Sequence, residues 1–466
     1  MDYKIKDFFK EISVISKIEG LRFQDISIDD IPGSANITKQ NKEFQISFKG
    51  IFKYPADGKL DINLSGEKYR VSSGTLKQTR FWSEIFDNVK GELTFDIKSM
   101  KRGDLKRNTS FRMFFFDTSK RKNLFHFKLE SPKYDEIIPW AFDCVRITLD
   151  EKRYDIIQHQ TTDQSYIIIE NLDQVSYRDF QRDSYAIQKG IGYLVGYMPG
   201  GEHYIFSGLN FEYYRLARES LKSIYYPVTR NPYSFEFSND YKNTADSYKE
   251  ILMVIPSTVI SKFVQQIRDN EEFSVAIIFL MEVLHLKSVV SMPGAFSVVL
   301  ESLADIITNP SKIKTNLITD KNLATEIIEE LHTVIDKYST TLDDESVLKL
   351  KRRLSALNSP ITPRRLTNAM KLREPFDQLG IILSSADEAA IEYRNYLLHG
   401  NILMNTDKPR NSEEIDIHMM YISGKLYTLL SKLLLKNCGF QGYVINHAKF
   451  FDSKEDPKEI YFFEKV

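Results

Sequence analysis

The chain has 466 residues, 42% of them hydrophobic, and its 63 Lys and Arg nearly balance its 64 Asp and Glu, for a formal net charge of −1. This composition predicts a globular protein of two or three domains, and it excludes a surface that is basic throughout, so any nucleic-acid site must be a local patch. Cys144 and Cys438 are the only cysteines and have no metal-ligand spacing. We therefore expect no disulfide framework, no metal site and no cofactor.

The first residues, Met1 to Lys4, run into charged residues without the apolar stretch of a signal peptide. The longest apolar run, Val275 to Met281, ends at Glu282 and is too short to span a membrane. These features predict a cytoplasmic protein with no membrane contact.

Alternation with a period of two dominates residues 40–172. Phe44, Ile46 and Phe48 alternate with polar residues, as expected for a strand with one buried face, and residues 60–64 repeat the pattern. The region predicts an antiparallel sandwich or curled sheet, although no turn spacing fixes its topology. Further strands are expected at residues 92–98, 111–116, 125–129, 145–149 and 166–169.

A helix is expected from Tyr177 to Gln188, followed by a hairpin from Tyr193 to Phe206 that is closed by residues 199–201. The glycines of residues 190–196 superficially suggest a phosphate-binding loop, but the strand before it and the helix after it are missing. We therefore predict no nucleotide fingerprint there. The β-rich part is expected to end near residue 240.

After residue 245 the apolar pattern takes the period of helices, which predicts a helical bundle. Two stripes of apolar residues mark two of its helices, and a third marks a long final helix that is capped by Ser412 and stops near Asn437 and Gly439. Residues 443–466 return to aromatic and β-branched residues and favour an added strand. The stripes are Phe296, Val299, Leu300, Leu303 and Ile307; Leu323, Ile327, Leu331, Val334 and Tyr338; and Ile415, Met419, Ile422, Leu426, Leu429 and Leu433.

The pattern as a whole predicts an α+β protein. Residues 1–240 are expected to form a β-rich sensor or binding domain, residues 241–440 an all-α helical domain, and residues 441–466 a C-terminal extension.

Eight basic residues and no acidic one lie between residues 349 and 373. Such a density predicts a path for an RNA backbone, because each phosphate contact adds salt-sensitive affinity and arginine binds phosphate with two hydrogen bonds. The alternative is a solvated helix face balanced by the acids of residues 343–345. The eight candidates are Lys349, Lys351, Arg352, Arg353, Arg364, Arg365, Lys371 and Arg373.

The next helix is expected from about Ala386 to His399, because residues 385–388 have the capping-box pattern and Gly400 stands where helix ends favour glycine. Asn395 and His399 are four residues apart and share a face. Arg394 and His399 are about 140° apart on an ideal helix, so the arginine must reach inward from the side.

These residue types suit phosphodiester transesterification. Histidine transfers protons near neutral pH and arginine is a permanent cation for the charge that develops on phosphorus, while Asn395 orients the imidazole or holds a phosphate oxygen. The alternative is that His399 only ends the helix and Arg394 pairs with Glu388 or Glu392.

The string from Arg394 to Gly400, Arg-Asn-x-x-x-His-Gly, resembles the signature of HEPN ribonucleases (higher eukaryotes and prokaryotes nucleotide-binding domains). The resemblance covers roughly Val275 to Lys436, and the β-rich half in front of it makes the architecture similar to ApeA-type anti-phage HEPN proteins. It implies that Arg394, Asn395 and His399 are catalytic, that the helical domain forms a homodimer with both motifs facing one cleft, and that cleavage needs no metal. A subset of HEPN domains is non-catalytic, which leaves a binding scaffold as the alternative.

Glu301 interrupts an apolar helical run, with Asp305 four residues later. A carboxylate there either orients Arg394 or His399 from a neighbouring helix, or is a solvent-facing helical residue. The remaining histidines stand alone, with neither Cys nor carboxylates at ligand spacing, so they predict no metal site.

The sequence therefore predicts a metal-independent endoribonuclease of the HEPN type that cleaves RNA, tRNA being one candidate, in anti-phage defence or as a toxin. A phage-derived trigger is expected at the β-rich half. The rivals are a non-catalytic HEPN-like scaffold that binds RNA, a nucleotide or a protein, and a carbohydrate- or protein-binding β module with a structural helical tail.

Overall fold

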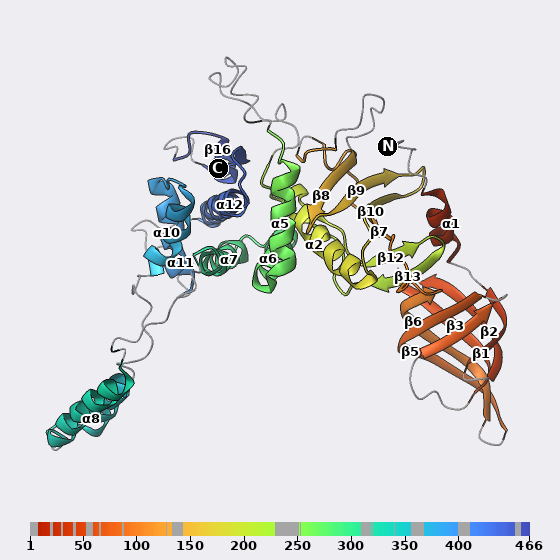
Figure 1. Ribbon diagram of the computed structural model, residues 1–466, viewed down its shortest axis with the longest axis horizontal. Coiled ribbons are helices and arrows are strands. Elements are labelled where there is room, and N and C mark those ends of the chain that lie inside the picture. Colours follow the sequence, from red (N-terminus) through yellow and green to blue (C-terminus); the bar gives the residue numbers. More distant parts are fainter. Residues whose placement is uncertain are drawn as a thin grey trace, which may run out of the picture.

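The fold was analysed in a computed structural model, which describes residues 8–18, 22–28, 31–40, 43–52, 59–64, 67–85, 88–126, 128–132, 143–228, 251, 253–308, 318, 320–339, 341–355, 368–398, 411–452 and 458–466. At residues 394–398 it describes the backbone alone. The chain is α+β, with an antiparallel sheet in the N-terminal half and helices in the C-terminal half, as the sequence predicted (Figure 1).

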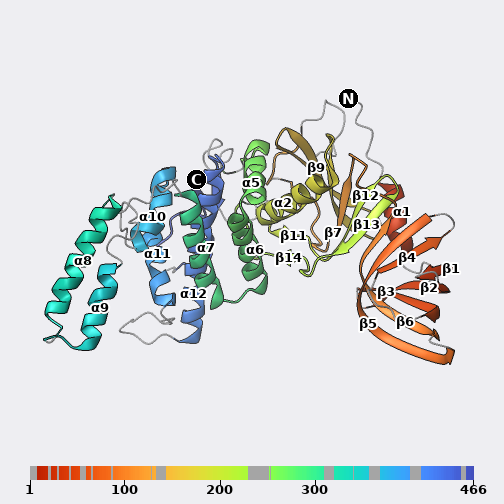
Figure 2. The same ribbon diagram turned by 60° about the horizontal axis from the view of Figure 1, so that its bottom comes forward.

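One twelve-stranded antiparallel sheet forms the N-terminal half. Its strands run in the order β1-β2-β3-β6-β13-β12-β7-β10-β9-β8, and β5 pairs with both β4 and β6. Strands β1–β6 form a strongly curled part of this sheet, in which β1 lies against β4 (Figure 2). The strands are β1 (Arg22–Ile28), β2 (Ile31–Gln40), β3 (Glu43–Phe52), β4 (Lys59–Leu64), β5 (Glu67–Ile85), β6 (Asn88–Arg102), β7 (Arg112–Phe116), β8 (Cys144–Leu149), β9 (Lys152–Gln160), β10 (Ser165–Asn171), β12 (Glu202–Ser207) and β13 (Asn210–Arg215).

Apolar cores lie on both faces of the central strands. On β7, Phe114 packs in the core beneath α1 (Phe9–Ile18), whereas Met113 and Phe115 belong to the core that contains α2 (Tyr177–Val195). Strands buried on both faces appear in the sequence as continuous apolar runs. Strand β3, between β2 and β6, instead shows the predicted alternation, since Phe44, Ile46 and Phe48 are buried and the residues between them are more exposed.

Helix α2 continues to Val195, seven residues beyond its predicted end, so the hairpin expected from Tyr193 is wrong in its first half. Gly190 and Gly192 lie inside the helix, where an added Cβ would come within 2.7 Å of Val264 and Met198 respectively. They serve close packing, and Gly196 ends the helix in the left-handed conformation at φ 71°.

The hairpin in this region is β12–β13, and residues 199–201 precede it. Two short strands flank it and pair with each other, β11 (Tyr197–Met198) and β14 (Leu221–Lys222). The strand predicted at residues 125–129 is also wrong: its described residues form turns, and Leu129 makes only an isolated bridge to Ile255.

The C-terminal half holds the predicted bundle. The stripe from Phe296 to Leu303 on α7 is buried as expected. Helix α12 is capped by Asn411, whose side chain forms a capping box with Glu414, one residue before the predicted cap Ser412. The helices are α5 (Ser257–Asp269), α6 (Glu271–Leu286), α7 (Ser291–Ile307), α10 (Asn368–Leu379), α11 (Ser385–Leu398) and α12 (Ser412–Asn437).

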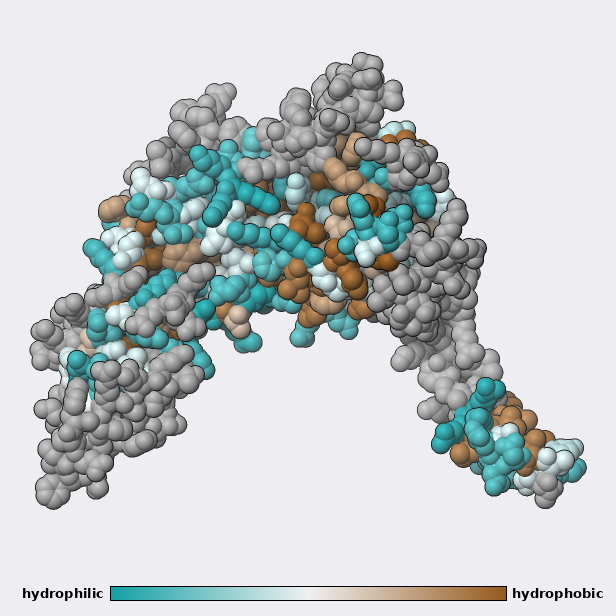
Figure 3. All heavy atoms as spheres, turned by 180° about the vertical axis from the view of Figure 1, so that it is seen from behind, coloured by the Kyte–Doolittle hydropathy of each residue, from teal (hydrophilic) through white to brown (hydrophobic). Residues whose placement is uncertain are grey.

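Helices α8 (Lys321–Lys337) and α9 (Asp344–Ser355) form a hairpin set apart from the other helices (Figures 1 and 2). The helix predicted from the apolar stripe between Leu323 and Tyr338 is present as α8, but Leu323, Val334 and Tyr338 are about half exposed. Hydrophobic and hydrophilic side chains both show on the hairpin surface, at the lower right of Figure 3. The stripe therefore does not lie in the core of the bundle.

A single apolar core joins the sheet to the bundle. It contains residues of β7–β10 and α2 together with residues of α5–α7 and α10–α12. Two short strands, β15 (Tyr443–Ile445) and β16 (Phe463–Lys465), pair beyond α12 and enclose the 3-10 helix η3 (His447–Phe451), so the final segment does return to strand. The predicted boundary at residue 240 lies outside the described residues. Among the helices of the described part, none is long and apolar enough to cross a membrane.

Candidate active site

Helix α11 carries the start of the Arg-Asn-x-x-x-His-Gly string in its last turn. Its N-terminus is fixed by a reciprocal pair: Asp387 N donates to Ser384 Oγ at 3.2 Å, and Ser384 N donates to Asp387 Oδ2 at 2.8 Å. The capping box is therefore formed by Ser384 and Asp387, one residue before the predicted one. The helix extends to Leu398, and His399 and Gly400 lie outside the described residues.

One side of α11 is packed in the bundle against α7, α10 and α12. Ala390, Ile391 and Tyr393 are almost fully buried. The Tyr393 hydroxyl donates to Met419 Sδ at 3.7 Å, and its ring meets His418 edge-on at 5.5 Å. Because 3.6 residues make a turn, positions 394 and 395 follow the buried positions 390 and 391 by one turn. Of the three residues predicted to form the apolar face of this helix, Ile391 is confirmed as buried, and the side chains of Leu397 and Leu398 lie outside the described part.

The acids proposed as ordinary partners for Arg394 already bind another cation. Arg373 on α10 contacts Glu388 at 3.3 Å and Glu392 at 2.9 Å. This pairing joins α10 to the outer face of α11. Whether Arg394 also pairs with Glu388 or Glu392 stays a prediction.

The basic residues predicted as one RNA path fall into two separate places. Lys349 pairs with Glu345 at 2.6 Å and Lys351 with Asp336 at 2.5 Å, all within the α8–α9 hairpin. Arg352 and Arg353 are exposed on α9.

The second group lies on α10, where Lys371 binds Asp305 of α7 at 2.8 Å. Arg373 is occupied by the acids of α11. Arg364 and Arg365 lie outside the described residues. Of the described members, Lys349, Arg352 and Arg353 are exposed, and Lys349 is paired with Glu345. RNA contact by any of the eight stays a prediction.

Glu301 is half-buried on α7, a helix that packs against α11. That it orients Arg394 or His399 stays a prediction. Asp305, one turn later, is engaged by Lys371.

A buried cluster of charged residues between α11 and α12 was not predicted from the sequence. Lys425 of α12, 2% exposed, contacts Asp387 at 2.9 Å, Glu459 at 2.9 Å and Glu464 at 3.0 Å. Lys432 adds a second cation, 3.0 Å from Glu464. Burial alone lowers the pKa of Lys425, but the three carboxylates raise it above the usual value. The cluster therefore ties the first turn of α11 to α12 and to the segment that ends in β16.

The sequence held one signal for this cluster, a lysine within the apolar run of α12. Two other titratable groups are buried in aromatic surroundings: burial lowers the pKa of both His203 and His447 to about 4. Within the residues that the structure describes, no group of three or more His, Cys, Asp or Glu is arranged to hold a metal ion.

Comparisons with protein-family models, with curated proteins and with solved structures give no match for this chain. The function must therefore be argued from its own residues.

Proposed function

We propose that the protein is a metal-independent HEPN-type endoribonuclease, with His399 as general acid and base, Arg394 as the transition-state cation and Asn395 as the orienting group. The observation that carries the proposal is the position of the Arg-Asn-x-x-x-His-Gly string, which begins in the last turn of a helix anchored within the bundle. A rigid helix is a suitable support for such a trio.

The reaction follows from these groups. His399 accepts the proton of a ribose 2′-hydroxyl, whose oxygen attacks the adjacent phosphorus while Arg394 stabilises the added negative charge. The bond from phosphorus to the 5′ oxygen then breaks, and that oxygen takes up a proton. The products are a 2′,3′-cyclic phosphate and a 5′-hydroxyl end.

The biological setting belongs to the same proposal. We place the enzyme in the cytoplasm, as a homodimer through the helical region, acting in anti-phage defence or as a toxin, with its trigger at the β-rich half. The support is the resemblance of the motif and the order of the two halves.

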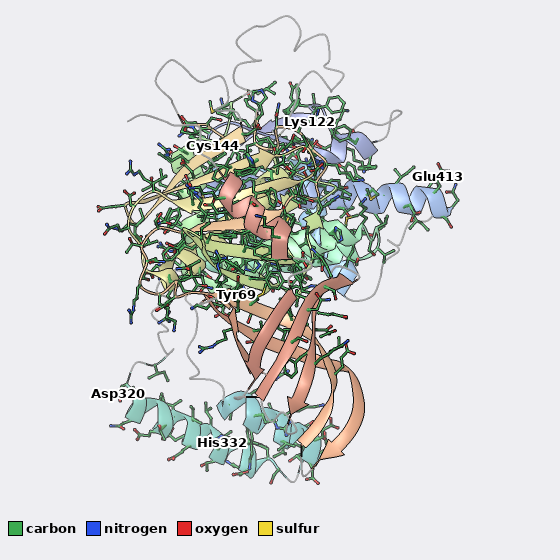
Figure 4. All side chains as sticks on the ribbon, turned by 90° about the vertical axis from the view of Figure 1, so that its right-hand side faces the viewer. Tyr69, Lys122, Cys144, Asp320, His332 and Glu413 are labelled. Atoms are coloured by element: carbon green, nitrogen blue, oxygen red, sulfur yellow. The ribbon has the colours of Figure 1, made fainter. Side chains whose placement is uncertain are left out.

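The test is incubation of the purified chain with total RNA in EDTA, followed by mapping of cleavage sites and end chemistry. We expect cleavage by wild type and by His332→Ala, a matched control on the α8–α9 hairpin (Figure 4), and none by His399→Ala or Arg394→Ala. Products with 3′-hydroxyl ends would rule out the mechanism. RNA binding without turnover, equal in wild type and His399→Ala, would favour the non-catalytic scaffold.

A further inference from the structure

An open pocket of about 530 Å³ lies on the β-rich half, where several chain segments meet. Its wall includes Lys39 at the end of β2, Phe116 at the end of β7, and Gly200 before β12. Lys120 and Lys222 complete it from the loop after β7 and from β14. The volume falls in the range of about 300–1,000 Å³ typical of small-molecule sites.

The pocket has a surplus of positive charge. Its two carboxylates already bind cations, since Glu202 accepts from Lys39 at 2.7 Å and Glu219 accepts from Arg215 at 2.9 Å. Lys120 and Lys222 are exposed, and within the described residues neither ammonium has a carboxylate partner. Two positive charges therefore face one concave space without compensation, which favours an anion.

The loop that carries Lys120 is held in place by hydrogen bonds to a buried carboxylate. Asp117 is buried and accepts hydrogen bonds from Ser119 N at 2.8 Å, Gln158 Nε2 at 2.7 Å and Ser165 Oγ at 3.0 Å. Lys120 itself has φ 59°, in the left-handed region that a residue with a side chain rarely adopts. Backbone strain of this kind gathers at functional sites.

The opposite wall is equally fixed. Gly200 N donates to Ser220 Oγ at 3.0 Å, and a Cβ at Gly200 would come within 2.6 Å of the Glu219 carbonyl oxygen, so the two segments touch. Lys222 pairs with Tyr197 across β11 and β14, and its backbone N–H donates to His285 Nδ1 at 3.0 Å. Both free lysines thus project from backbone that is ordered before any ligand arrives.

We propose that this pocket binds a small phosphorylated molecule of about the size of a nucleoside diphosphate, with its phosphate groups between Lys120 and Lys222 and its apolar part toward Phe116. Lysine binds phosphate as a compact point charge. A polynucleotide does not fit as well, because a tract of backbone phosphates needs a row of cations, whereas Glu202 and Glu219 stand in this wall. The proposal does not depend on the nuclease proposal.

Calorimetric titration of the full chain with ADP, inorganic pyrophosphate and adenosine tests the site. We expect ADP to bind one-to-one and adenosine to bind about tenfold more weakly or not at all, with affinity falling as salt rises. Lys120→Ala and Lys222→Ala should each weaken ADP binding about tenfold, and Lys120→Arg should retain most of it.

Lys122→Ala is the matched control, since this exposed lysine lies on the same loop but not in the pocket wall (Figure 4). It should bind ADP like wild type. The proposal fails if neither ADP nor pyrophosphate binds at about 1 mM, or if both alanine variants at positions 120 and 222 bind like wild type. Unfolding curves of all variants check that the fold is intact.

Discussion

Lys425 is the most deeply buried cation described in the helical half, and the carboxylates around it come from three places in the sequence. Whether a lysine in an apolar helical run is buried or reaches solvent depends on partners that lie far along the chain. Asp387 is 38 residues away, and Glu459 and Glu464 follow α12 altogether. Sequence periodicity carries no such information, so this cluster was missed while the apolar positions beside it were predicted correctly.

Lys425→Met should destabilise the fold strongly, because it leaves Asp387, Glu459 and Glu464 buried without their common cation. Breaking a buried ion pair on one side costs about 3–5 kcal/mol. Urea unfolding measures the loss. Lys349→Met, which removes only an exposed pair with Glu345, should cost about 1 kcal/mol or less; equal losses in the two variants would contradict the argument.

His447 predicts a pH dependence of stability. Its Nε2 donates to the Tyr226 carbonyl at 2.9 Å, its ring lies 4.5 Å from Tyr225, and burial lowers its pKa to about 4. The unfolded chain takes up a proton near pH 6.5 and the folded chain does not, so stability is lost as pH falls from about 6.5 toward 4.

In His447→Gln, that loss should be smaller by about 2–3 kcal/mol, because Gln keeps a donor for the carbonyl but does not titrate. Urea unfolding from pH 7 to pH 4.5 measures it. An unchanged pH slope in the variant would show that the imidazole is not the group responsible.

At the Arg-Asn-x-x-x-His-Gly string, the sequence predicted the helix and nearly its bounds. The helix, its start within one residue and its buried position at Ile391 follow from periodicity and capping chemistry. The pairing of Glu388 and Glu392 with Arg373 could not be predicted, because it depends on how α10 packs beside α11.

Among the elements, the largest departure from prediction is the end of α2. The helix was predicted to end at Gln188, and the glycines at positions 190, 192 and 196 that follow disfavour a helix interior. Packing against α5 and β11 prevails over this preference, because only glycine lets those segments approach. Of the central strands, β7 and β10 were among the predicted strands and β9 was not, and the order of the strands in the sheet was not predictable.

Gly192→Ala and Gly294→Ala should shift stability in opposite directions. A Cβ at Gly192 would lie 2.7 Å from Met198 Cα, so we expect a loss of about 1–3 kcal/mol. A Cβ at Gly294 of α7 meets no atom within 4 Å, so the higher helix preference of alanine should raise the free energy of unfolding by at most about 1 kcal/mol. Thermal unfolding compares the two, and a stabilising Gly192→Ala would refute the close-packing explanation.

For the whole molecule, the decisive feature is the core that the sheet and the bundle share. Tyr193 of α2 packs against Phe263 of α5 and Tyr427 of α12, and its hydroxyl lies 3.1 Å from Ser431 Oγ. Contacts of this kind join the two halves into one apolar interior. The sequence indicated two regions by their different periods, but a change of period does not reveal whether two regions share a core.

A fragment of residues 1–240 should therefore not fold as a stable unit. It would expose Ile191, Tyr193 and Leu194 of α2, all buried in the full chain. We expect the fragment to aggregate on expression and to bind a hydrophobic dye. Co-expression of residues 241–466 should largely reverse both effects. A soluble, monodisperse fragment 1–240 would instead support an independent β domain and the rival reading of a binding module with a structural tail.

The α8–α9 hairpin has a consequence for the shape of the molecule in solution. A compact chain of 466 residues has a radius of gyration of about 23 Å. Each atom contributes the square of its distance from the centre of mass to the square of this radius. The hairpin in Figure 1 lies far from the centre, so it should raise the radius of gyration measured by small-angle X-ray scattering. Replacing residues 320–355 by a short linker should lower the radius of gyration by a larger fraction than their share of the mass. The hairpin therefore determines how extended the molecule is in solution.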